Sequence, residues 1–325
     1  MSGKRPIPPS TLVDVRYHSM DEVNQVARAT GWQGDYRQLS KGPVTSRWRS
    51  LHLGQASVVS HRVDARVYAR VAPPQGTVAM AMASQPSAML IEGAAFGKNQ
   101  TLVTDAEMDY VTADEIHALT LVVPRLVLEA SGRTLFPRMS MNGELAREMK
   151  VPPSGWLALQ GDFESLLRIG SISSEELSVL LSRFLDMMAG ETDSAPREAS
   201  LGNRSTGRVA RRARDYIEDH YGDTIRMEDL CRFAGVSLRT LQRSFAEYFQ
   251  VSPLEYIKKR RLNAARLDLV ADDSPLHTVT EIALDNGFTH LGRFSVNYRE
   301  LFGESPSETL ARRMSSQVTH RTFDL

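Results

Sequence analysis

The side chains best suited to bind another molecule gather near the end of the chain, where basic and amide residues recur at helical spacing. Arg239, Gln242 and Arg243 stand at positions i, i+3 and i+4, which places them on one face of a helix. Arginine and glutamine can each make two hydrogen bonds to the edge of one base in the major groove of DNA. From Arg226 to Arg266 the sequence holds nine basic and four acidic residues, which favours a polyanionic partner. These residues predict a local nucleic-acid-binding surface.

A second group of positive charges, Lys258-Lys259-Arg260-Arg261, begins a predicted helix over residues 254–270. A run of charges is usually a solvated face, but beside base-reading residues it favours contact with phosphates, which position a protein on DNA without reading its sequence. The whole chain holds 39 basic and 39 acidic residues, so the signal for a polyanion is local.

The other histidine, glycine and cysteine residues do not form the pattern of a catalytic or metal site. His52, His61 and His117 are separated by 9 and 56 residues, without the close histidine pair and carboxylate of a metal site. The segment GAAFG at 93–97 lacks the lysine and hydroxyl residue of a phosphate-binding loop. A single cysteine, Cys231, excludes a disulfide framework and a cysteine-rich zinc site. We predict no catalytic residue, no metal, no cofactor and no enzyme activity.

An internal repeat supplies the elements that position the basic residues. Residues 229–253 and 281–306 each read as a helix, a glycine, a short turn, a second amphipathic helix and a Ser-Pro pair. Gly235 and Gly287 occupy the turns, where a positive φ favours glycine. The repeat predicts two helix-turn-helix units joined by one long helix, with two plain helical hairpins as the alternative.

Capping residues fix where these helices begin. Ser237 is expected to cap the helix after the first turn, and Thr289 or His290 the helix after the second. Thr278 and Glu281 form a capping-box pattern at the start of the second unit. The predicted helices cover residues 216–220, 228–234, 238–249, 254–270, 279–286 and 290–302.

The order and spacing of motifs in residues 207–313 resemble the DNA-binding domain of the AraC/XylS family of bacterial transcription regulators. The matching segments are GVS at 235–237, RRLNAARL at 260–267, NGF at 286–288 and FGESPS at 302–307. The resemblance implies an all-helical domain whose two recognition helices enter successive major-groove segments on one face of promoter DNA. It also implies contact with RNA polymerase and activation of transcription, with repression as the alternative.

The predicted site residues lie around the two turns and at the start of the connecting helix. Those implied to read bases are Arg239, Gln242, Arg243, His290, Leu291 and Arg293. Those implied to contact phosphates are Ser237, Lys258, Lys259, Arg260 and Thr289. Arg226 stands where the family commonly has a Ser or Thr cap, and Leu291 and Gly292 where it often has polar residues. The first unit is therefore expected to be the stronger reader.

The first half is predicted to be rich in strands. Runs of Val, Ile and Met at 56–61, 66–71, 78–82 and 89–92 are separated by proline and glycine, as in antiparallel sheets, and 118–128 could add a strand broken at Pro124. This module resembles the family's cupin-like effector and dimerisation domain, which implies a small-molecule effector. A regulator controlled by a partner protein, or one fused to an enzyme-like cupin, is the alternative. Val78, Met80 and Met82 are interpreted as strand core, with the lining of an effector pocket as the alternative.

A helix over residues 174–189 is predicted from the capping pair Ser173 and Glu176 and from apolar residues at helical spacing. Leu181, Phe184 and Met188 lie on one face of this helix. That face could form the interface of a homodimer or could cover the core of its own domain.

Composition and length fit a globular protein of two domains: 325 residues, 42% hydrophobic and 24% charged. The predicted α+β architecture has a β-rich cupin-like domain at 1–190, with its sheet core at about 45–130 and helices to 190. A polar linker follows at 191–207, then an all-α DNA-binding domain at 208–313 and a flexible tail at 314–325. No stretch of roughly 20 apolar residues predicts a membrane segment, and residues 1–10 do not resemble a signal peptide. A cytoplasmic location is expected.

Overall fold

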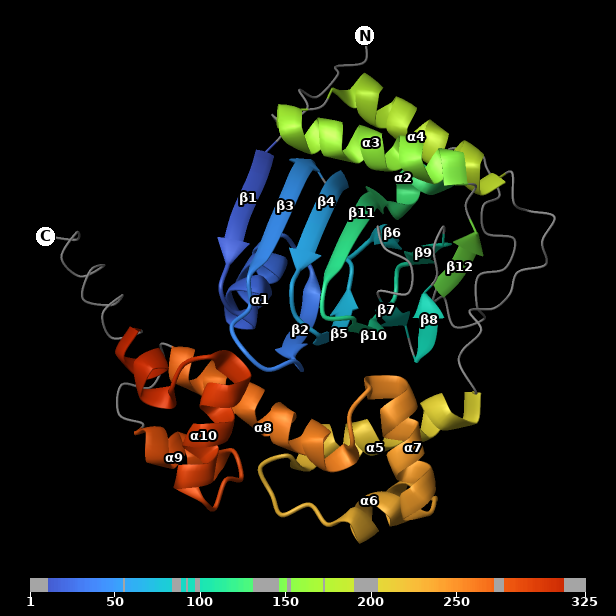
Figure 1. Ribbon diagram of the computed structural model, residues 1–325. Coiled ribbons are helices and arrows are strands. Elements are labelled where there is room, and N and C mark those ends of the chain that lie inside the picture. Colours follow the sequence, from blue (N-terminus) through green and yellow to red (C-terminus); the bar gives the residue numbers. More distant parts are fainter. Residues whose placement is uncertain are drawn as a thin grey trace, which may run out of the picture.

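The computed structural model describes residues 11–54, 56–83, 89–91, 93–96, 100–130, 146–150, 153–171, 173–189, 204–271 and 278–312. Strands dominate the first half of the chain and helices make up the second half (Figure 1). The predicted α+β architecture is therefore confirmed. The predicted tail at 314–325 and linker residues 191–203 lie outside the described residues.

Two antiparallel sheets form the first half and pack against each other. One has the strand order β1-β3-β4-β11-β6-β9-β12, and the other β2-β5-β10-β7-β8. The strands are β1 (Thr11–Tyr17), β2 (Gln33–Gln38), β3 (Ser46–Leu53), β4 (Ala56–Val63), β5 (Val67–Ala72), β6 (Thr77–Ala83), β7 (Met89–Ile91), β8 (Ala94–Phe96), β9 (Gln100–Thr104), β10 (Met108–Thr112), β11 (Ile116–Pro124) and β12 (Ala146–Lys150). The four predicted runs coincide with β4, β5, β6 and β7. The run at 118–128 is a strand only as far as Pro124, after which helix α2 (Arg125–Ala130) begins.

Helices α3 (Pro153–Ile169) and α4 (Ser174–Ala189) cover the outer face of the seven-stranded sheet (Figure 1). Strand β6 reads TVAMAMA, and side chains alternate between the two faces of a strand. Val78, Met80 and Met82 point outward and are buried in one cluster with Phe163 of α3 and Phe184 of α4. Their interpretation as strand core is confirmed.

A short helix missed in the sequence, α1 (Met20–Ala29), packs beside β1 and β2. Ser19 caps it by accepting a hydrogen bond from the backbone N–H of Glu22. Met20, Val23 and Ala27 are buried at helical spacing, so the capping residue and the apolar period were both present as signals.

Six helices form the second half: α5 (Arg204–His220), α6 (Met227–Ala234), α7 (Leu238–Phe249), α8 (Pro253–Val270), α9 (Val279–Asp285) and α10 (Leu291–Phe302). Five of them match the predicted helices within a residue or so. Helix α5 starts 12 residues before the predicted position at Tyr216, so the last residues of the predicted linker are helical. None of the helices in the described part of the chain is long and apolar enough to cross a membrane.

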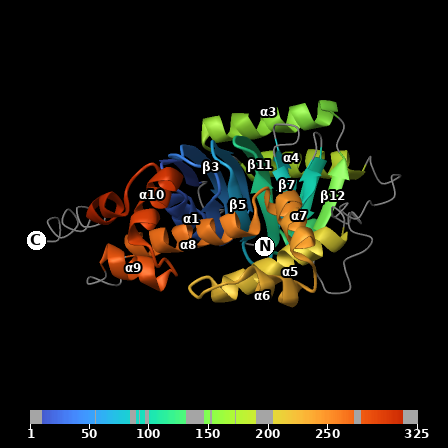
Figure 2. The ribbon, with the colours of Figure 1, turned by 60° about the horizontal axis from the view of Figure 1, so that its bottom comes forward.

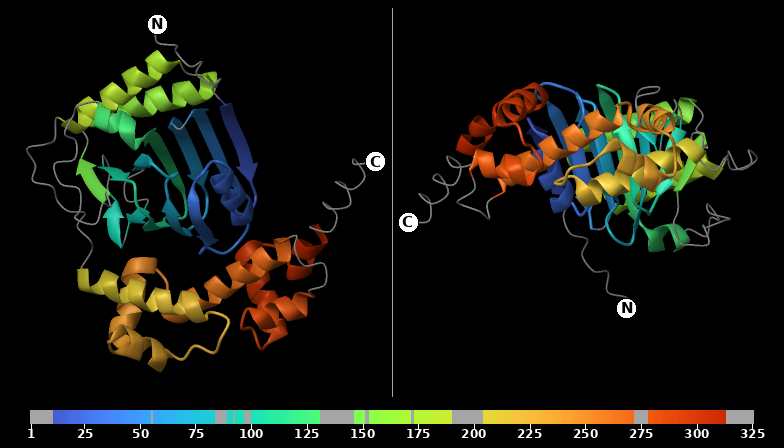
Figure 3. Two further views of the ribbon diagram at one scale, coloured as in Figure 1. Left: turned by 180° about the vertical axis from the view of Figure 1, so that it is seen from behind. Right: turned by 90° about the horizontal axis from the view of Figure 1, so that it is seen from below.

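Helix α8 runs between two small helical cores (Figure 3). One core packs α5, α6 and α7 around Leu241, Phe245 and Phe249. The other packs α9 and α10 around Phe294 and Tyr298. The predicted pair of helix-turn-helix units on one connecting helix is what the structure shows.

The outer face of the five-stranded sheet packs on this helical half (Figures 1 and 2). Tyr68 of β5 and Val111 of β10 belong to the same buried cluster as Phe249, and the Tyr68 ring meets the Phe249 ring edge-on at 5.5 Å. The five-stranded sheet therefore lies between the interior of the first half and the helices of the second.

Candidate DNA interface

The first helix-turn-helix unit consists of α6, a turn at Gly235 and α7. Gly235 has a φ of +72°, and Ser237 caps α7 by accepting a hydrogen bond from the Thr240 N–H. Arg239, Gln242 and Arg243 are all exposed, whereas the opposite face of α7 is buried in the helical core. Arg243 makes only a long, exposed ion pair with Glu247, at 3.8 Å, so its guanidinium can turn to a base at little cost. The predicted shared face is present; base contact stays a prediction.

The second unit has the same plan with a less polar face. Thr278 and Glu281 form the predicted capping box at α9. His290 is the N-cap residue of α10 but makes no side-chain capping hydrogen bond. His290, Leu291 and Arg293 are exposed, so Arg293 is the strongest candidate for base reading in this unit. The expectation that the first unit reads bases better stays a prediction supported by these side-chain types.

The predicted phosphate contacts divide into two groups. Ser237 and Thr289 are exposed beside the starts of α7 and α10, where free backbone N–H groups attract anions. Lys258 is 35% exposed in its side chain and pairs with Glu255 at 2.7 Å. These three remain available to phosphate.

Lys259 and Arg260 are turned inward, so their assignment as phosphate contacts is corrected. The Lys259 side chain is 11% exposed, with its ammonium 3.4 Å from Glu255. Arg260 is 14% exposed in its side chain and donates to Glu218 of α5 at 2.7 Å. Its guanidinium also lies 3.7 Å from the centre of the Tyr221 ring. Both charges serve packing within the protein.

Arg261, the last residue of the same run, holds the two units together and was not singled out in the sequence. Its guanidinium donates to the backbone carbonyl oxygens of Tyr221 at 2.7 Å, Asp223 at 2.6 Å and Gly287 at 2.9 Å. Tyr221 and Asp223 precede α6 in the first unit, and Gly287 is the turn of the second. A charge run gives no signal for such a role, because the three acceptors are backbone groups.

The two turn glycines differ in their surroundings, and this difference makes a prediction. A Cβ at Gly235 would meet nothing within 4 Å, whereas one at Gly287 would lie 2.8 Å from the Gly222 carbonyl oxygen and 3.0 Å from Arg261 Cζ. Gly235→Ala should therefore cost only the left-handed backbone penalty of about 1–2 kcal/mol. Gly287→Ala should add a steric cost of about 1–3 kcal/mol. Denaturant unfolding of both variants measures the difference; equal losses would contradict the crowding at Gly287.

Buried ion pairs join the two-sheet half to the helices. Arg214 of α5 contacts Asp109 of β10, and these residues are only 5% and 6% exposed. The Tyr68 hydroxyl donates to the same carboxylate at 2.9 Å, and the Tyr248 hydroxyl lies within 3.5 Å of it. A carboxylate at this depth needs such partners, because an unpaired buried charge is strongly unfavourable.

Two further contacts extend this junction along α8. Glu218 of α5 accepts from Arg37 of β2 at 2.9 Å; burial would raise its pKa, but Arg37 and Arg260 hold the pKa at about 2. Arg266 of α8 donates to Asp21 of α1 at 2.5 Å.

An amide link reaches the second unit itself. Gln38 donates to the Leu301 carbonyl of α10 at 2.6 Å, and its backbone exchanges two hydrogen bonds of 3.1 Å with the Asn263 side chain of α8. The two-sheet half thus contacts both helix-turn-helix units.

The remaining candidate groups show no reactive arrangement. Arg226 is the N-cap of α6 and makes no side-chain capping bond, as its residue type predicts. Cys231 packs against the helical core, and burial raises the pKa of its thiol, which favours the unreactive form. His117 lies 2.9 Å from the Ser60 hydroxyl. Within the described ranges no group of three or more His, Cys, Asp or Glu side chains is arranged to hold a metal.

The expected dimer face of α4 is corrected in part. Phe184 is fully buried and Leu181 is 8% exposed, both in the cluster beneath α3 and α4. They cover the core of their own domain, which was the alternative left open. The side chain of Met188 lies outside what the structure describes.

Known proteins resemble the helical half of the chain. Residues 230–312 match a family described as a helix-turn-helix domain. A XylDLEGF operon transcriptional activator from Pseudomonas putida is 38% identical over 133 residues, which are 41% of this chain and 39% of that protein. The chain thus covers well under half the length of that relative. A solved structure of a probable AraC family transcriptional regulator from Rhodopseudomonas palustris is 38% identical over 32% of this chain and 96% of that chain, with a TM-score of 0.31.

A second Pseudomonas putida protein, most of whose length the chain covers, shows to which family the chain belongs. XylDLEGF operon transcriptional activator 2 is 39% identical over 110 residues, which are 34% of this chain and 70% of that protein. The match of residues 230–312 to a helix-turn-helix family agrees with the two units that the structure shows. The chain belongs to the AraC/XylS family of transcription regulators.

Proposed function

We propose that the protein is a promoter-binding transcription activator that reads two successive major-groove segments with α7 and α10. The observation that carries this proposal is the pairing of two exposed recognition helices on one connecting helix. Their outward faces carry Arg239, Gln242, Arg243 and Arg293, residue types that recognise guanine and adenine edges. Relatives at 38–39% identity are activators by name, which supports activation over repression.

The two-sheet half is proposed to control how the units engage DNA. Its support is the junction, in which Asp109, Arg37 and Gln38 contact α5, α8 and α10. Because the two-sheet half contacts both helix-turn-helix units, a rigid-body shift of this half can change the angle between the two recognition helices.

Further partners belong to the same proposal. An activator acts by contacting RNA polymerase at the promoter, which places the protein in the cytoplasm.

A homodimer is also proposed, with the contact moved from Phe184 to exposed apolar residues beside α4. Leu126 and Val127 of α2 are 76% and 44% exposed and border a shallow groove against α4. Sedimentation at micromolar concentration measures the assembly.

Genome-wide mapping of the DNA bound by the full chain, combined with transcript levels in cells with and without the gene, tests this function. We expect a small number of sites upstream of genes whose transcripts fall when the gene is deleted. If the transcripts of those genes rise when the gene is deleted, the protein is a repressor of these genes and not an activator. Binding spread evenly over the genome would overturn sequence-specific reading.

A further inference from the structure

The two-sheet half completes the end of the second recognition helix. A helix leaves the carbonyl oxygens of its last turn without partners inside the helix. At the end of α10, the backbone N–H of Gly42 donates to the carbonyl oxygens of Glu300 at 3.0 Å and Leu301 at 3.1 Å. The side-chain amide of Gln38 donates to the same Leu301 oxygen at 2.6 Å. Two carbonyl groups in the last turn of α10 are therefore satisfied by the other half of the chain.

The two donors belong to residues 38–43, which we call the capping loop. Within it, the Gln38 amide also donates to the Gly42 carbonyl at 2.6 Å. The loop is tied to the start of β5, because Ser40 and Arg66 exchange hydrogen bonds of 3.0 and 3.2 Å. Gly42 has a φ of +100°, a backbone conformation that favours glycine. The capping loop therefore has a defined shape that presents both donors to α10.

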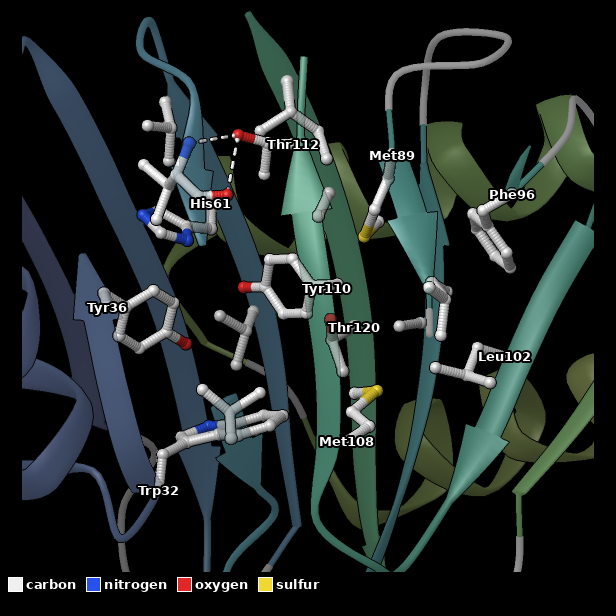
Figure 4. A pocket seen from close by; sticks show the side chains of 18 of the residues that line it. Trp32, Tyr36, His61, Met89, Phe96, Leu102, Met108, Tyr110, Thr112 and Thr120 are labelled. Atoms are coloured by element: carbon white, nitrogen blue, oxygen red, sulfur yellow. Dashed lines mark hydrogen bonds between the residues drawn. The ribbon is translucent and has the colours of Figure 1, made fainter. Parts of the chain in front are cut away.

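The strands that carry the capping loop are fixed from the interior. The ring of Tyr36 in β2 points into the space between the two sheets (Figure 4). The Tyr36 backbone exchanges hydrogen bonds of 2.8 and 3.1 Å with the Asn24 side chain of α1. At the start of β5, the Val67 N–H donates to the Thr112 hydroxyl at 2.8 Å (Figure 4). The capping loop thus extends from a fixed base and is expected to move with the two-sheet half.

The Gln38 side chain acts as a donor toward α10. It is 3% exposed, and three carbonyl oxygens surround its nitrogen, those of Ser40 at 3.0 Å, Gly42 at 2.6 Å and Leu301 at 2.6 Å. An amide oxygen in this place would face three other oxygens, so the nitrogen must occupy it. A buried carbonyl group that loses its donor is costly, so the cap depends on this amide.

Backbone packing adds to the hydrogen bonds at the same point. Gly303 ends α10 with a φ of +77°, and a Cβ there would lie 3.2 Å from the Pro43 nitrogen and Cδ. The chains therefore approach as closely as a glycine allows. Lys41 pairs with Glu300 at 2.7 Å, but both side chains are largely exposed and such a pair contributes little. The hydrogen bonds and the close packing carry the contact.

The first recognition helix meets the two-sheet half in a different way. Near the end of α7, the Tyr248 hydroxyl lies 3.5 Å from the Asp109 carboxylate. The Phe249 ring packs edge-on against the Tyr68 ring at 5.5 Å. These are contacts between side chains and do not involve the last carbonyl groups of α7. Breaking the capping loop should therefore act on the second unit and spare the first.

The capped end of α10 lies opposite the end that is proposed to read bases. From Arg293 to Leu301 the helix makes about two turns, roughly 12 Å at about 1.5 Å per residue. His290, Leu291 and Arg293 are exposed while the capping contacts are made. The contact thus leaves these side chains free and fixes the direction in which they point.

We propose that the capping loop holds α10 in the orientation in which it reads DNA, and that Gln38 is a positioning residue for base reading by the second unit. This inference rests on the proposed function, because it names how the two-sheet half acts on one recognition helix. The closed contact favours DNA binding by α10, so bound DNA must favour the closed contact by the same factor. Opening it releases the second unit while the first keeps its hold.

Gln38→Met tests the donor in the full chain. Methionine is similar in length and unbranched, so it fills the same space but cannot donate a hydrogen bond to α10. Affinity is measured for the operator found by genome-wide mapping and for the same duplex with its second segment scrambled. We expect the variant to bind the intact operator about fivefold or more weakly, because fewer molecules hold α10 in the reading orientation. Its affinity for the scrambled duplex should stay within about twofold of wild type.

The ratio of these two affinities separates positioning from a general loss of structure. A partly unfolded protein binds both duplexes more weakly by one factor, which leaves the ratio unchanged, whereas loss of positioning moves the ratio toward one. Gln33→Met is the matched control, because Gln33 lies on the same strand but is exposed; it should keep the wild-type ratio. Asn263→Ala removes the two 3.1 Å bonds that hold the Gln38 backbone to α8. It is the second variant should Gln38→Met not fold, with the same expected ratio.

Hydrogen exchange at the Gly42 amide gives the sign of the coupling in the wild-type chain. This N–H donates to α10, so it exchanges when the contact opens. The intact operator should slow its exchange by about fivefold or more relative to the scrambled duplex. An operator that speeds the exchange would show that DNA binding breaks the contact, and the proposal would be wrong in its sign.

The remaining outcomes also decide. A wild-type ratio in folded Gln38→Met, whether affinity is unchanged or falls equally on both duplexes, would overturn the role of the capping loop. Failure of the inference and failure of the proposed function remain distinct. A wild-type chain that does not prefer the intact operator over the scrambled duplex counts against reading by two units. A clear preference that survives both Gln38→Met and Asn263→Ala counts against the capping loop alone.

Discussion

Arg214→Met is expected to lower the free energy of unfolding by about 3–5 kcal/mol, because it leaves the Asp109 carboxylate buried without its cation. Asp109 is 6% exposed at the junction between β10 and α5, and the hydroxyls of Tyr68 and Tyr248 cannot neutralise it. Hydrogen exchange should rise first in β5, β10 and α5, where the two halves meet. Denaturant unfolding gives the magnitude, and exchange gives the location.

A double variant separates loss of charge balance from loss of packing. Replacing a buried ion pair with apolar residues is often close to neutral, so Arg214→Met with Asp109→Leu should recover most of the lost stability. Arg47→Met serves as the matched control, since its pair with Asp14 is 42% and 32% exposed and should contribute less than about 1 kcal/mol. A single variant as stable as this control would show that the junction does not depend on the pair.

Arg261→Met is expected to reduce affinity for a two-part operator by about tenfold or more, because hydrogen bonds from a charged group contribute roughly 1.5–3 kcal/mol each. The side chain makes three, to carbonyls of both units. Without them the recognition helices lose their fixed separation. Wild-type binding should therefore fall steeply when one base pair is inserted between the half-sites, and the variant should be nearly indifferent to the insertion.

Lysine is the sharper replacement for the same test. Arg261→Lys keeps the charge but cannot spread donors over three carbonyls, so it should behave like Arg261→Met. Arg299→Met is the control, since Arg299 is an exposed cation on α10 that pairs with Glu308 at 3.2 Å. If Arg261→Lys kept the wild-type dependence on spacing, charge alone would account for the role of Arg261.

The recognition faces could be predicted because they depend on local spacing alone. Arg239, Gln242 and Arg243 follow a turn glycine and alternate with apolar residues, so a 3.6-residue period fixes which side they occupy. The same reasoning failed for Lys259 and Arg260. Arg260 turns toward Glu218, about forty residues earlier in the chain, whose carboxylate it shares with Arg37 of the first half. Lys259 turns toward Glu255 on its own helix. A run of basic residues in the sequence shows that the segment is positively charged, but it does not show which groups those side chains contact in the fold.

The strands of the first half and the helix over residues 174–189 were predicted, but the order in which the strands pair was not, since pairing is non-local. The alternation of Met and Ala in β6 was visible in the sequence, yet which set faces the interior depends on α3 and α4 packing on the other side. Which side chains line the interior therefore could not be predicted before the two sheets were seen together. Phe184 shows the same limit, because an amphipathic helix covers a core or a partner with the same pattern.

Protection of guanine N7 atoms from methylation in the major groove tests the central claim most directly, that two recognition helices read two adjacent segments of one operator. The full chain should protect two clusters of guanines on one face of the DNA, about one helical turn apart. Arg243→Ala should remove protection from one cluster and lower affinity by about 1–3 kcal/mol. Arg293→Ala should act on the other cluster only. A single protected cluster, or two clusters that both survive these substitutions while only the salt dependence changes, would contradict base reading by α7 and α10.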